Sequence, residues 1–264
     1  MKKIFIDLFS GIGGFALAAY WAGLRFDKHY FSEIDNYAVQ VYSKHFPDAE
    51  QLGDIRNVDY KKLPKGDYIV AGGFPCQPHS QTGKRKGSED ERDLWPECRR
   101  MLRELQPRIA LFENVPGLFT SPGGTRKGEF FNGVLSDITA SGYDSEWDVI
   151  SAEEVGANHK RERVWIVAYA RCRRWDRLDK DKKNGYPKIN MEKYSNWETS
   201  EESILRFYMD RVFHNPNSGV CRNDDGLSEG MDRLRCLGNA IVPHCAEMIF
   251  DLPAFDEWRV TQWK

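Results

Sequence analysis

The tetrapeptide Phe74-Pro75-Cys76-Gln77 carries the residue best suited to covalent chemistry in this chain. It follows the apolar run Tyr68–Ala71 and two glycines, which predicts that Cys76 is displayed at the carboxyl end of a buried strand. Ligands bind at that edge of open α/β sheets. A cysteine becomes a strong nucleophile when nearby positive charge or a proton acceptor lowers the pKa of its thiol. Because a structural role is commoner for a single cysteine, the hypothesis depends on what surrounds Cys76.

Two further segments supply groups that could act together with this thiol. Glu113 follows the apolar segment Arg108–Phe112, and a carboxyl group at a strand end could protonate or hydrogen-bond a ring nitrogen. Arg161 and Arg163 alternate with an acidic residue before the apolar segment Val164–Ala168, which directs both arginines to one face of an extended chain. Two guanidinium groups there suit an anionic or carbonyl group and would lower the pKa of the thiol. A simple charge pair at a strand edge is the alternative for the arginines.

A glycine-rich turn near the N-terminus indicates a nucleotide-like cofactor. The run Gly11–Gly14 joins a strand expected over Lys3–Phe9 to a helix expected over Gly13–Trp21. Glycines let the backbone approach a ligand, and the helix N-terminus offers free N–H groups. At the ends of the next two extended segments, Glu33 could accept from both ribose hydroxyls and Asp54 from an adenine amino group. The alternative for the glycine run is a plain tight turn, that for Glu33 is a helix cap, and that for Asp54 is a turn carboxylate.

The first 170 residues alternate apolar strand segments with amphipathic helices, which predicts a doubly wound, mostly parallel α/β sheet. Residues 171–231 are charged and rich in turn residues, and apolar character returns afterwards with a helix expected over Pro243–Leu252. We therefore predict one catalytic and cofactor-binding domain from residues 1–170 and 232–264, interrupted by a small inserted region at 171–231. The other expected strands are His29–Ile34, Asp67–Ala71, Arg108–Phe112, Glu146–Ile150 and Val164–Ala168, and the other expected helices include one ending near His45, Leu94–Leu105 and Phe131–Ser141.

Composition and charge narrow the class of protein. With 264 residues, 41% of them hydrophobic and 30% charged, the chain is expected to be soluble and globular, with no membrane span and no signal peptide. Six scattered cysteines without a Cys-x-x-Cys pair predict reduced thiols in a cytoplasm and no metal site. The net charge of −2 argues against a wholly basic nucleic-acid binder. However, the segment Lys160–Lys183 contains ten Lys/Arg and four Asp/Glu, and Lys84–Lys86 is also basic. An anionic polymer is therefore a reasonable partner.

Taken together and in this order, these segments resemble the DNA (cytosine-5) methyltransferase family. Gly-Phe-Pro-Cys-Gln, with Glu-Asn-Val downstream and Gly-Asn-Ala near the C-terminus, is a highly specific combination. The resemblance implies an S-adenosylmethionine-dependent methyltransferase fold, with residues 171–231 as a target-recognition region. It also implies a monomer acting on double-stranded DNA in a bacterial or phage-infected cell. The similar segments are Asp7–Phe15, Phe31–Asp35, Gly53–Ile55, Gly72–Ser80, Glu113–Val115, Arg161–Arg163 and Leu237–Pro243.

The resemblance further implies a role for each site residue. Cys76 would add as a thiolate to C6 of a flipped-out cytosine while Glu113 engages N3, and C5 would then take the methyl group of S-adenosylmethionine. Arg161 and Arg163 would hold the cytosine O2 and the nearby backbone, and His79–Lys86 would close over the base. Cofactor contacts are implied for Phe9, Gly11, Ile12, Gly13, Glu33, Ile34, Asp54, Ile55, Pro75, Asn239 and Ala240, and nucleic-acid contacts for Ser80, Gln81, Lys84, Arg85, Arg173, Arg174 and Arg177.

Two departures from the family pattern leave alternatives open. His159 stands where the family usually has glutamine, and the inserted region is short. A tRNA-directed cytosine-5 methyltransferase of the same superfamily, which lacks a large recognition domain, is the runner-up. The basic segment in the insert favours DNA. A non-catalytic DNA-binding or cofactor-binding relative is a third reading, and a nicotinamide oxidoreductase with a redox thiol is a fourth, although it would not explain Glu113 or the two arginines.

Overall fold

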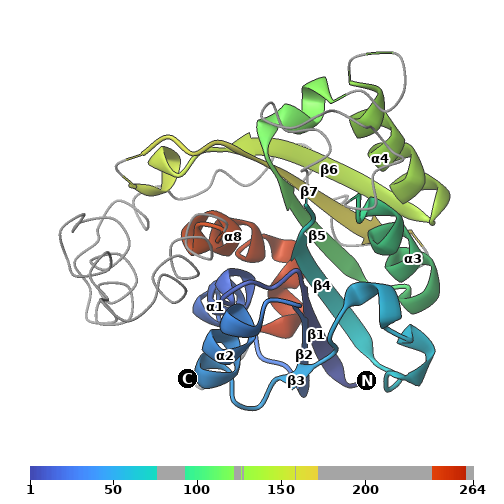
Figure 1. Cartoon of the computed structure of the whole chain (residues 1–264), viewed down its shortest axis with the longest axis vertical. Helices are drawn as coiled ribbons and strands as arrows, with labels where there is room; N and C mark the ends of the chain where they lie inside the picture. The colour runs from blue at the N-terminus through green and yellow to red at the C-terminus, as the bar shows by residue number, and fades with distance from the viewer. Residues whose placement is uncertain (76–92, 122–125, 127, 158, 172–239, 260–264) are drawn as a thin grey trace.

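A seven-stranded, mostly parallel sheet forms the centre of the molecule (Figure 1). The computed structural model describes residues 1–75, 93–121, 126, 128–157, 159–171 and 240–259. The strand order is β3-β2-β1-β4-β5-β7-β6, and β7 alone runs antiparallel to both of its neighbours. The predicted fold class is therefore confirmed. The strands are β1 (Lys3–Leu8), β2 (Lys28–Ser32), β3 (Glu50–Gln51), β4 (Asp67–Gly73), β5 (Ile109–Asn114), β6 (Tyr143–Ile150) and β7 (Arg163–Ala170).

Helices cover both faces of the sheet, with α1, α2 and α8 on one side and α3 and α4 on the other (Figure 1). Ile4, Ile6 and Leu8 of β1 belong to the core beneath α3 and α4, whereas Phe5 belongs to the core beneath α1 and α8. Because successive side chains of a strand point to opposite faces, the apolar run of β1 is buried on both sides. No helix in the described part of the chain is long and apolar enough to cross a membrane. The helices are α1 (Gly14–Trp21), α2 (Asn36–His45), α3 (Trp95–Leu105), α4 (Glu129–Ala140) and α8 (Pro243–Phe250).

Most expected elements occur within a few residues of their predicted bounds, and the differences matter mainly near strand ends. The strand expected over Arg108–Phe112 continues to Asn114, so Glu113 lies inside β5 rather than after it. The pairing of β5 with β4 continues as far as Glu113, and its pairing with β7 continues as far as Asn114. The inserted region expected at 171–231 lies outside the described residues apart from Arg171, so its boundaries stay a prediction.

Tyr42 of α2 ties this helix to β1 beneath the glycine-rich turn. Its hydroxyl donates to Asp7 Oδ2 at 3.1 Å and lies 2.8 Å from His29 Nε2, and all three residues are buried. Burial lowers the pKa of His29 to about 4, so this imidazole is uncharged at neutral pH, and burial raises the pKa of Asp7. A Cβ added at Gly13 would come within 3.2 Å of the Tyr42 ring. Tyr42 therefore packs against the Gly11–Gly14 turn and stabilises it.

Substituting Tyr42→Phe is expected to lower the free energy of unfolding by about 1–3 kcal/mol, because Asp7 and His29 each lose a buried hydrogen-bond partner while the ring packing is kept. Urea unfolding followed by circular dichroism measures the change. Tyr20→Phe is the matched control, since that ring packs in the same core and its hydroxyl makes no hydrogen bond within the described residues. A loss no larger than that of the control would contradict the role given to the Tyr42 hydroxyl.

Candidate active site

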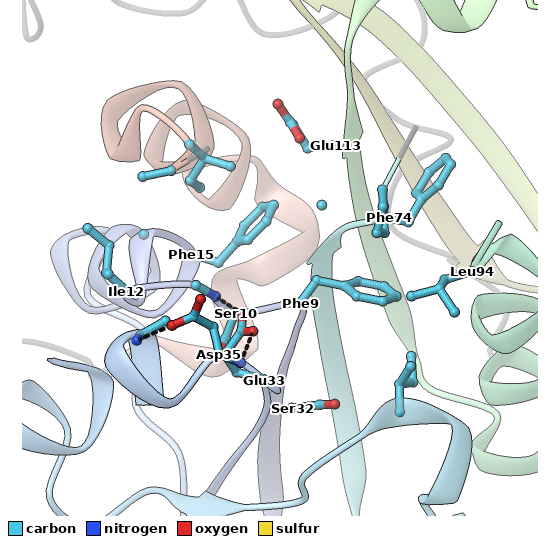
Figure 2. Close-up of a pocket in the computed structure, with 18 of the residues that line it drawn as sticks. Phe9, Ser10, Ile12, Phe15, Ser32, Glu33, Asp35, Phe74, Leu94 and Glu113 are labelled. Carbon is cyan, nitrogen blue, oxygen red and sulfur yellow. Dashed lines mark hydrogen bonds between the residues drawn. The ribbon is translucent and has the colours of Figure 1, made fainter. Parts of the chain in front are cut away.

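A cavity of about 610 Å³ opens where β1, β2, β4 and β5 end (Figure 2). Residues directly at or beyond these strand ends line it, including Phe9, Ser32, Phe74 and Glu113, as expected for the carboxyl edge of a parallel sheet. Most of the predicted site residues that the structure describes line the same cavity. They are Phe9, Gly11, Ile12, Glu33, Ile34, Asp54, Ile55, Pro75, Glu113, Arg161, Arg163 and Ala240.

The remaining predicted residues divide into two groups. Gly13 does not line the cavity: its φ of 96° turns the chain toward α2, and an added Cβ would lie 2.6 Å from the Phe46 ring. Steric room and a positive φ therefore account for a glycine at this position, and its cofactor contact stays a prediction. The other predicted residues lie outside the described residues and stay predictions. These are Cys76, Ser80, Gln81, Lys84, Arg85, Arg173, Arg174, Arg177 and Asn239.

The turn after β1 presents an aromatic ring and an unsatisfied hydroxyl to the cavity. Phe9 has a φ of 52°, a left-handed conformation that costs a non-glycine residue about 1–3 kcal/mol and that is typically found at functional sites. Ser10 follows it, with its backbone N–H bonded to the Ser32 carbonyl at 3.1 Å. The Ser10 hydroxyl oxygen is buried and has no hydrogen-bond partner among the described residues. Buried polar groups are normally paired, so this hydroxyl has unused hydrogen-bonding capacity within the described part of the site.

Glu33 connects the end of β2 to the glycine-rich turn. Its Oε2 accepts from the Gly11 N–H at 2.8 Å, and its Oε1 accepts from the Ile34 and Asp35 N–H groups at 2.8 and 2.9 Å. Asp35, rather than Glu33, caps α2, because its carboxylate accepts from the Tyr37 and Ala38 N–H groups. A carboxylate has about four lone-pair sites, so Glu33 keeps capacity for one further donor.

Asp54 lines the cavity from a turn and not from a strand. The strand-like segment expected to end there contains only β3, and Asp54 is the N-cap of a short 3₁₀ helix, Ile55–Asn57. Its carboxylate accepts from the Arg56 backbone N–H at 3.0 Å and from the Arg56 side chain at 2.6 Å. These bonds lower the pKa of Asp54, so it remains an ionised acceptor. The Gly53 carbonyl, just before it, accepts from the Ser32 hydroxyl at 2.7 Å.

Glu113 is a buried carboxyl group held by an arginine. Its side chain is 12% exposed, and Arg163 Nε lies 2.9 Å from its Oε1. Burial raises the pKa of Glu113 and outweighs the positive charges of Arg163 and Arg161, which lower it. A carboxyl group in this state can carry and donate a proton. Gly73 on the neighbouring strand leaves the necessary room, since a Cβ there would lie 2.9 Å from Glu113 Oε2.

Arg161 reaches the cavity by a different route from the one the sequence suggested. β7 begins at Arg163, and Arg161 lies before it with a φ of 30°, so strand alternation does not place the two arginines on one face. The prediction that strand alternation directs both arginines to one face is therefore wrong, although both residues line the cavity. Arg161 Nη2 donates to the Ala240 carbonyl at 2.7 Å, which ties this segment to the C-terminal part of the chain. Burial and the two arginines lower the pKa of His159, so it adds no positive charge at neutral pH.

The sequence pattern assigned no binding or catalytic role to several residues of the site. Asn114 donates from Nδ2 to the Phe74 carbonyl at 3.0 Å and accepts from the Val115 N–H at 2.8 Å, so it anchors the chain two residues before Cys76. Phe15 packs edge-on against Trp165 at the back of the cavity. The Glu-Asn-Val motif contained Asn114, but its target carbonyl is set by the pairing of β4 with β5 and not by local sequence.

Most of the chain matches the model of one protein family. The family described as C-5 cytosine-specific DNA methylase matches residues 4–224. The chain belongs to this family. Among curated relatives, the type II methyltransferase M.BsuFI of Bacillus subtilis is 36% identical over 174 residues, which cover 64% of this chain and 40% of that protein. The orphan methyltransferase M.Rho11sI of Bacillus phage rho11s is 38% identical over 171 residues, covering 63% of this chain and 33% of that protein. The matched part of this methylase thus spans less than half of either relative.

Solved structures agree with the fold of this methylase. A prophage-encoded E. coli protein described as a DNA modification methyltransferase has a TM-score of 0.51 at 29% identity, covering 64% of this chain and 47% of that one. A triple mutant of DNMT2 from Spodoptera frugiperda has a TM-score of 0.54 at 24% identity, covering 67% and 52%, and this likeness concerns the fold alone.

Substituting Arg163→Met is expected to raise the pKa of Glu113 further, because a positive charge 2.9 Å from the carboxylate is removed while its burial remains. Carbon-13 NMR titration of labelled glutamate side chains measures the pKa, and the spectrum of Glu113→Gln identifies the resonance. Arg171→Met is the matched control, since Arg171 follows the opposite end of β7 and pairs with Asp144. An unchanged or lowered pKa in Arg163→Met would contradict the electrostatic account of the site.

Proposed function

We propose that this methylase transfers a methyl group from S-adenosylmethionine to C5 of a flipped-out cytosine in double-stranded DNA, through a covalent adduct between Cys76 and C6. The observation that carries the proposal is the buried carboxyl group of Glu113, paired with Arg163 in the cavity that Pro75 also lines. Cys76 follows Pro75 directly in the chain. The site therefore pairs a proton donor with the position expected for a nucleophile.

The proposed reaction needs both groups because cytosine C5 is a weak nucleophile. The Cys76 thiolate forms a bond to C6 while Glu113 donates a proton to N3, and electron density moves to C5. C5 would then take the methyl group of S-adenosylmethionine, whose bond from sulfur to the methyl carbon breaks and leaves S-adenosylhomocysteine. Loss of the C5 proton to a base breaks the bond to sulfur, restores the aromatic ring and releases the thiolate, while the N3 proton returns to Glu113. Arg163 pairs with Glu113, and in this proposal Arg163 and Arg161 bind the cytosine carbonyl O2 and the nearby backbone.

The cavity fits S-adenosylmethionine, which supplies an electrophilic methyl group when it is bound. Its volume lies within the range of small-molecule sites, about 300–1,000 Å³. Phe9 offers an aromatic face for an adenine, and the ionised carboxylate of Asp54 suits an amino group. Glu33 retains acceptor capacity for ribose hydroxyls. The Ser10 hydroxyl, which has no partner among the residues that the structure describes, suits the carboxylate of the methionine part. We also assign Gly11, Ile12, Ile34, Ile55, Pro75 and Ala240 to this binding site.

The nucleic-acid partner is proposed from the family and the charge pattern. A base inside a duplex cannot reach a cavity at a sheet edge, so the target cytosine must leave the stack. We propose that Ser80, Gln81, Lys84 and Arg85 contact the substrate near the flipped base, and that residues 171–231, including Arg173, Arg174 and Arg177, read the target sequence. The proposed enzyme acts as a monomer in the cytoplasm of a bacterial or phage-infected cell.

Transfer of a labelled methyl group from S-adenosylmethionine to duplex DNA tests the function. The wild-type chain is expected to label DNA, and Cys76→Ser is expected to lose at least about 10³-fold in rate, because a hydroxyl cannot replace the thiolate. Cys221→Ser, a cysteine outside the matched motifs, is the control. Label retained in Cys76→Ser would contradict the covalent mechanism, and label entering tRNA in preference to DNA would replace the proposal with the tRNA-directed alternative.

The substitution Glu113→Gln tests the second catalytic group. We expect kcat to fall by about 10²–10⁴-fold, because glutamine has no acidic proton to donate to N3. Binding of S-adenosylmethionine, measured by calorimetry, should stay within about twofold of wild type, since the proposed cofactor contacts do not include Glu113. Glu162→Gln is the matched control, as Glu162 lies between the two arginines but pairs with Lys160. A kcat equal to that of wild type would remove Glu113 from the mechanism.

A further inference from the structure

Arg100 joins α3 to the wall of the cavity that carries Asp54. Its Nη2 donates to the Ile55 carbonyl at 2.7 Å, and its Nη1 donates to the Val58 carbonyl at 2.8 Å. These carbonyls lie 45 and 42 residues earlier in the chain. Ile55 itself lines the cavity, whereas Arg100 does not. The Arg100 side chain thus links α3 directly to the Ile55–Val58 segment. Along the backbone these two segments are separated by β4 and the residues after it.

The guanidinium group of Arg100 is itself held in a fixed orientation. Glu97 accepts from its Nε at 2.7 Å, and Glu104 accepts from its Nη1 at 3.4 Å. The Tyr60 ring lies against it, with the guanidinium carbon 5.0 Å from the ring centre. Charge-assisted hydrogen bonds and a cation–π contact act together on a side chain that is 27% exposed. This arrangement determines where its donors point.

The Ile55 carbonyl belongs to the same peptide unit as the Arg56 N–H. The carbonyl accepts from Arg100, and the N–H donates to Asp54 Oδ1 at 3.0 Å. A peptide unit is planar, so rotating it would move both groups at once. Arg100 therefore restrains one of the donors that orient the Asp54 carboxylate, and no contact between Arg100 and Asp54 is found among the described residues. The Arg56 side chain supplies the other donors. Ser32 restrains the other side of this turn through the Gly53 carbonyl.

We infer that Arg100 is a positioning residue for cofactor recognition, acting through the Ile55–Arg56 peptide unit on the carboxylate of Asp54. This inference rests on the proposed use of S-adenosylmethionine. Asp54 is the acceptor proposed for the adenine amino group, so its orientation determines how well the site distinguishes that amino group from a carbonyl oxygen. Loss of Arg100 should weaken cofactor binding and this discrimination while leaving the chemistry at Glu113 intact.

Arg100→Met and Arg100→Lys test the inference in the chain of 264 residues. Lysine keeps the charge, but its compact ammonium group cannot bridge two carbonyls as the planar guanidinium does. Calorimetry should show the dissociation constant for S-adenosylmethionine rising about tenfold in both variants, with kcat at saturating cofactor within about twofold of wild type. Arg103→Met is the matched control, because Arg103 is an exposed residue of the same helix.

A second measurement separates positioning from a general structural role. Binding is compared for S-adenosylmethionine and its analogue with oxygen in place of the adenine amino group. Wild type should prefer the amino form, and Arg100→Met should lose at least about fivefold of that preference. When Asp54→Asn is already present, adding Arg100→Met should cause no further loss of preference relative to Asp54→Asn alone. A variant that is merely less stable would have a lower melting temperature with unchanged discrimination, measured well below that temperature.

The outcomes distinguish this inference from the proposed function. If wild type binds S-adenosylmethionine and methylates DNA, but Arg100→Met and Arg100→Lys bind the cofactor with unchanged affinity and discrimination, the role of Arg100 is refuted and the function stands. If wild type fails to bind S-adenosylmethionine, the proposed function is refuted together with the inference.

Discussion

Parallel pairing of β1, β2, β4 and β5 is the constraint on which the rest of the site depends. In this register Leu8 lies beside Ser32 and Gly72, and Gly73 lies beside Glu113. All four strands therefore end at one edge, where helices no longer cover the sheet and a cavity can form. The glycine-rich turn, the carboxylates and the Pro75 segment come from distant parts of the sequence, and only the sheet brings them together. Strand pairing is thus the source of the catalytic geometry.

Burial at that edge gives the charged groups their chemical character. Glu113 lies within β5 and is almost fully covered, so its proton affinity is set by the balance between desolvation and two arginines. Asp54, on a half-buried turn, accepts from several donors, which lower its pKa and keep it ionised. The pKa values of two carboxyl groups in one cavity are thereby shifted in opposite directions, one toward proton donation and one toward accepting a hydrogen bond. In water the two side chains would have similar pKa values.

Backbone carbonyls provide the contacts that hold the walls of the cavity in place. Asn114 binds the carbonyl of Phe74, Arg161 that of Ala240, and Arg100 those of Ile55 and Val58. Each of these bonds joins segments at least 40 residues apart. The cavity is therefore shaped by long-range side chain to backbone bonds in addition to the sheet.

The sequence by itself determined the fold class, the family and about half of the residues that line the cavity, because strand periodicity, glycine turns and the Pro-Cys-Gln motif are local features. Asp35 as a helix cap was also predictable for this reason. Tertiary structure alone decided the protonation tendency of Glu113, the conformation of Arg161 before β7 and the packing role of Gly13. It also decided the part played by Arg100, whose helix sequence shows its acidic neighbours but not the carbonyls it binds. Burial and contacts between distant segments have no local signature, so these properties exist only once the chain has folded.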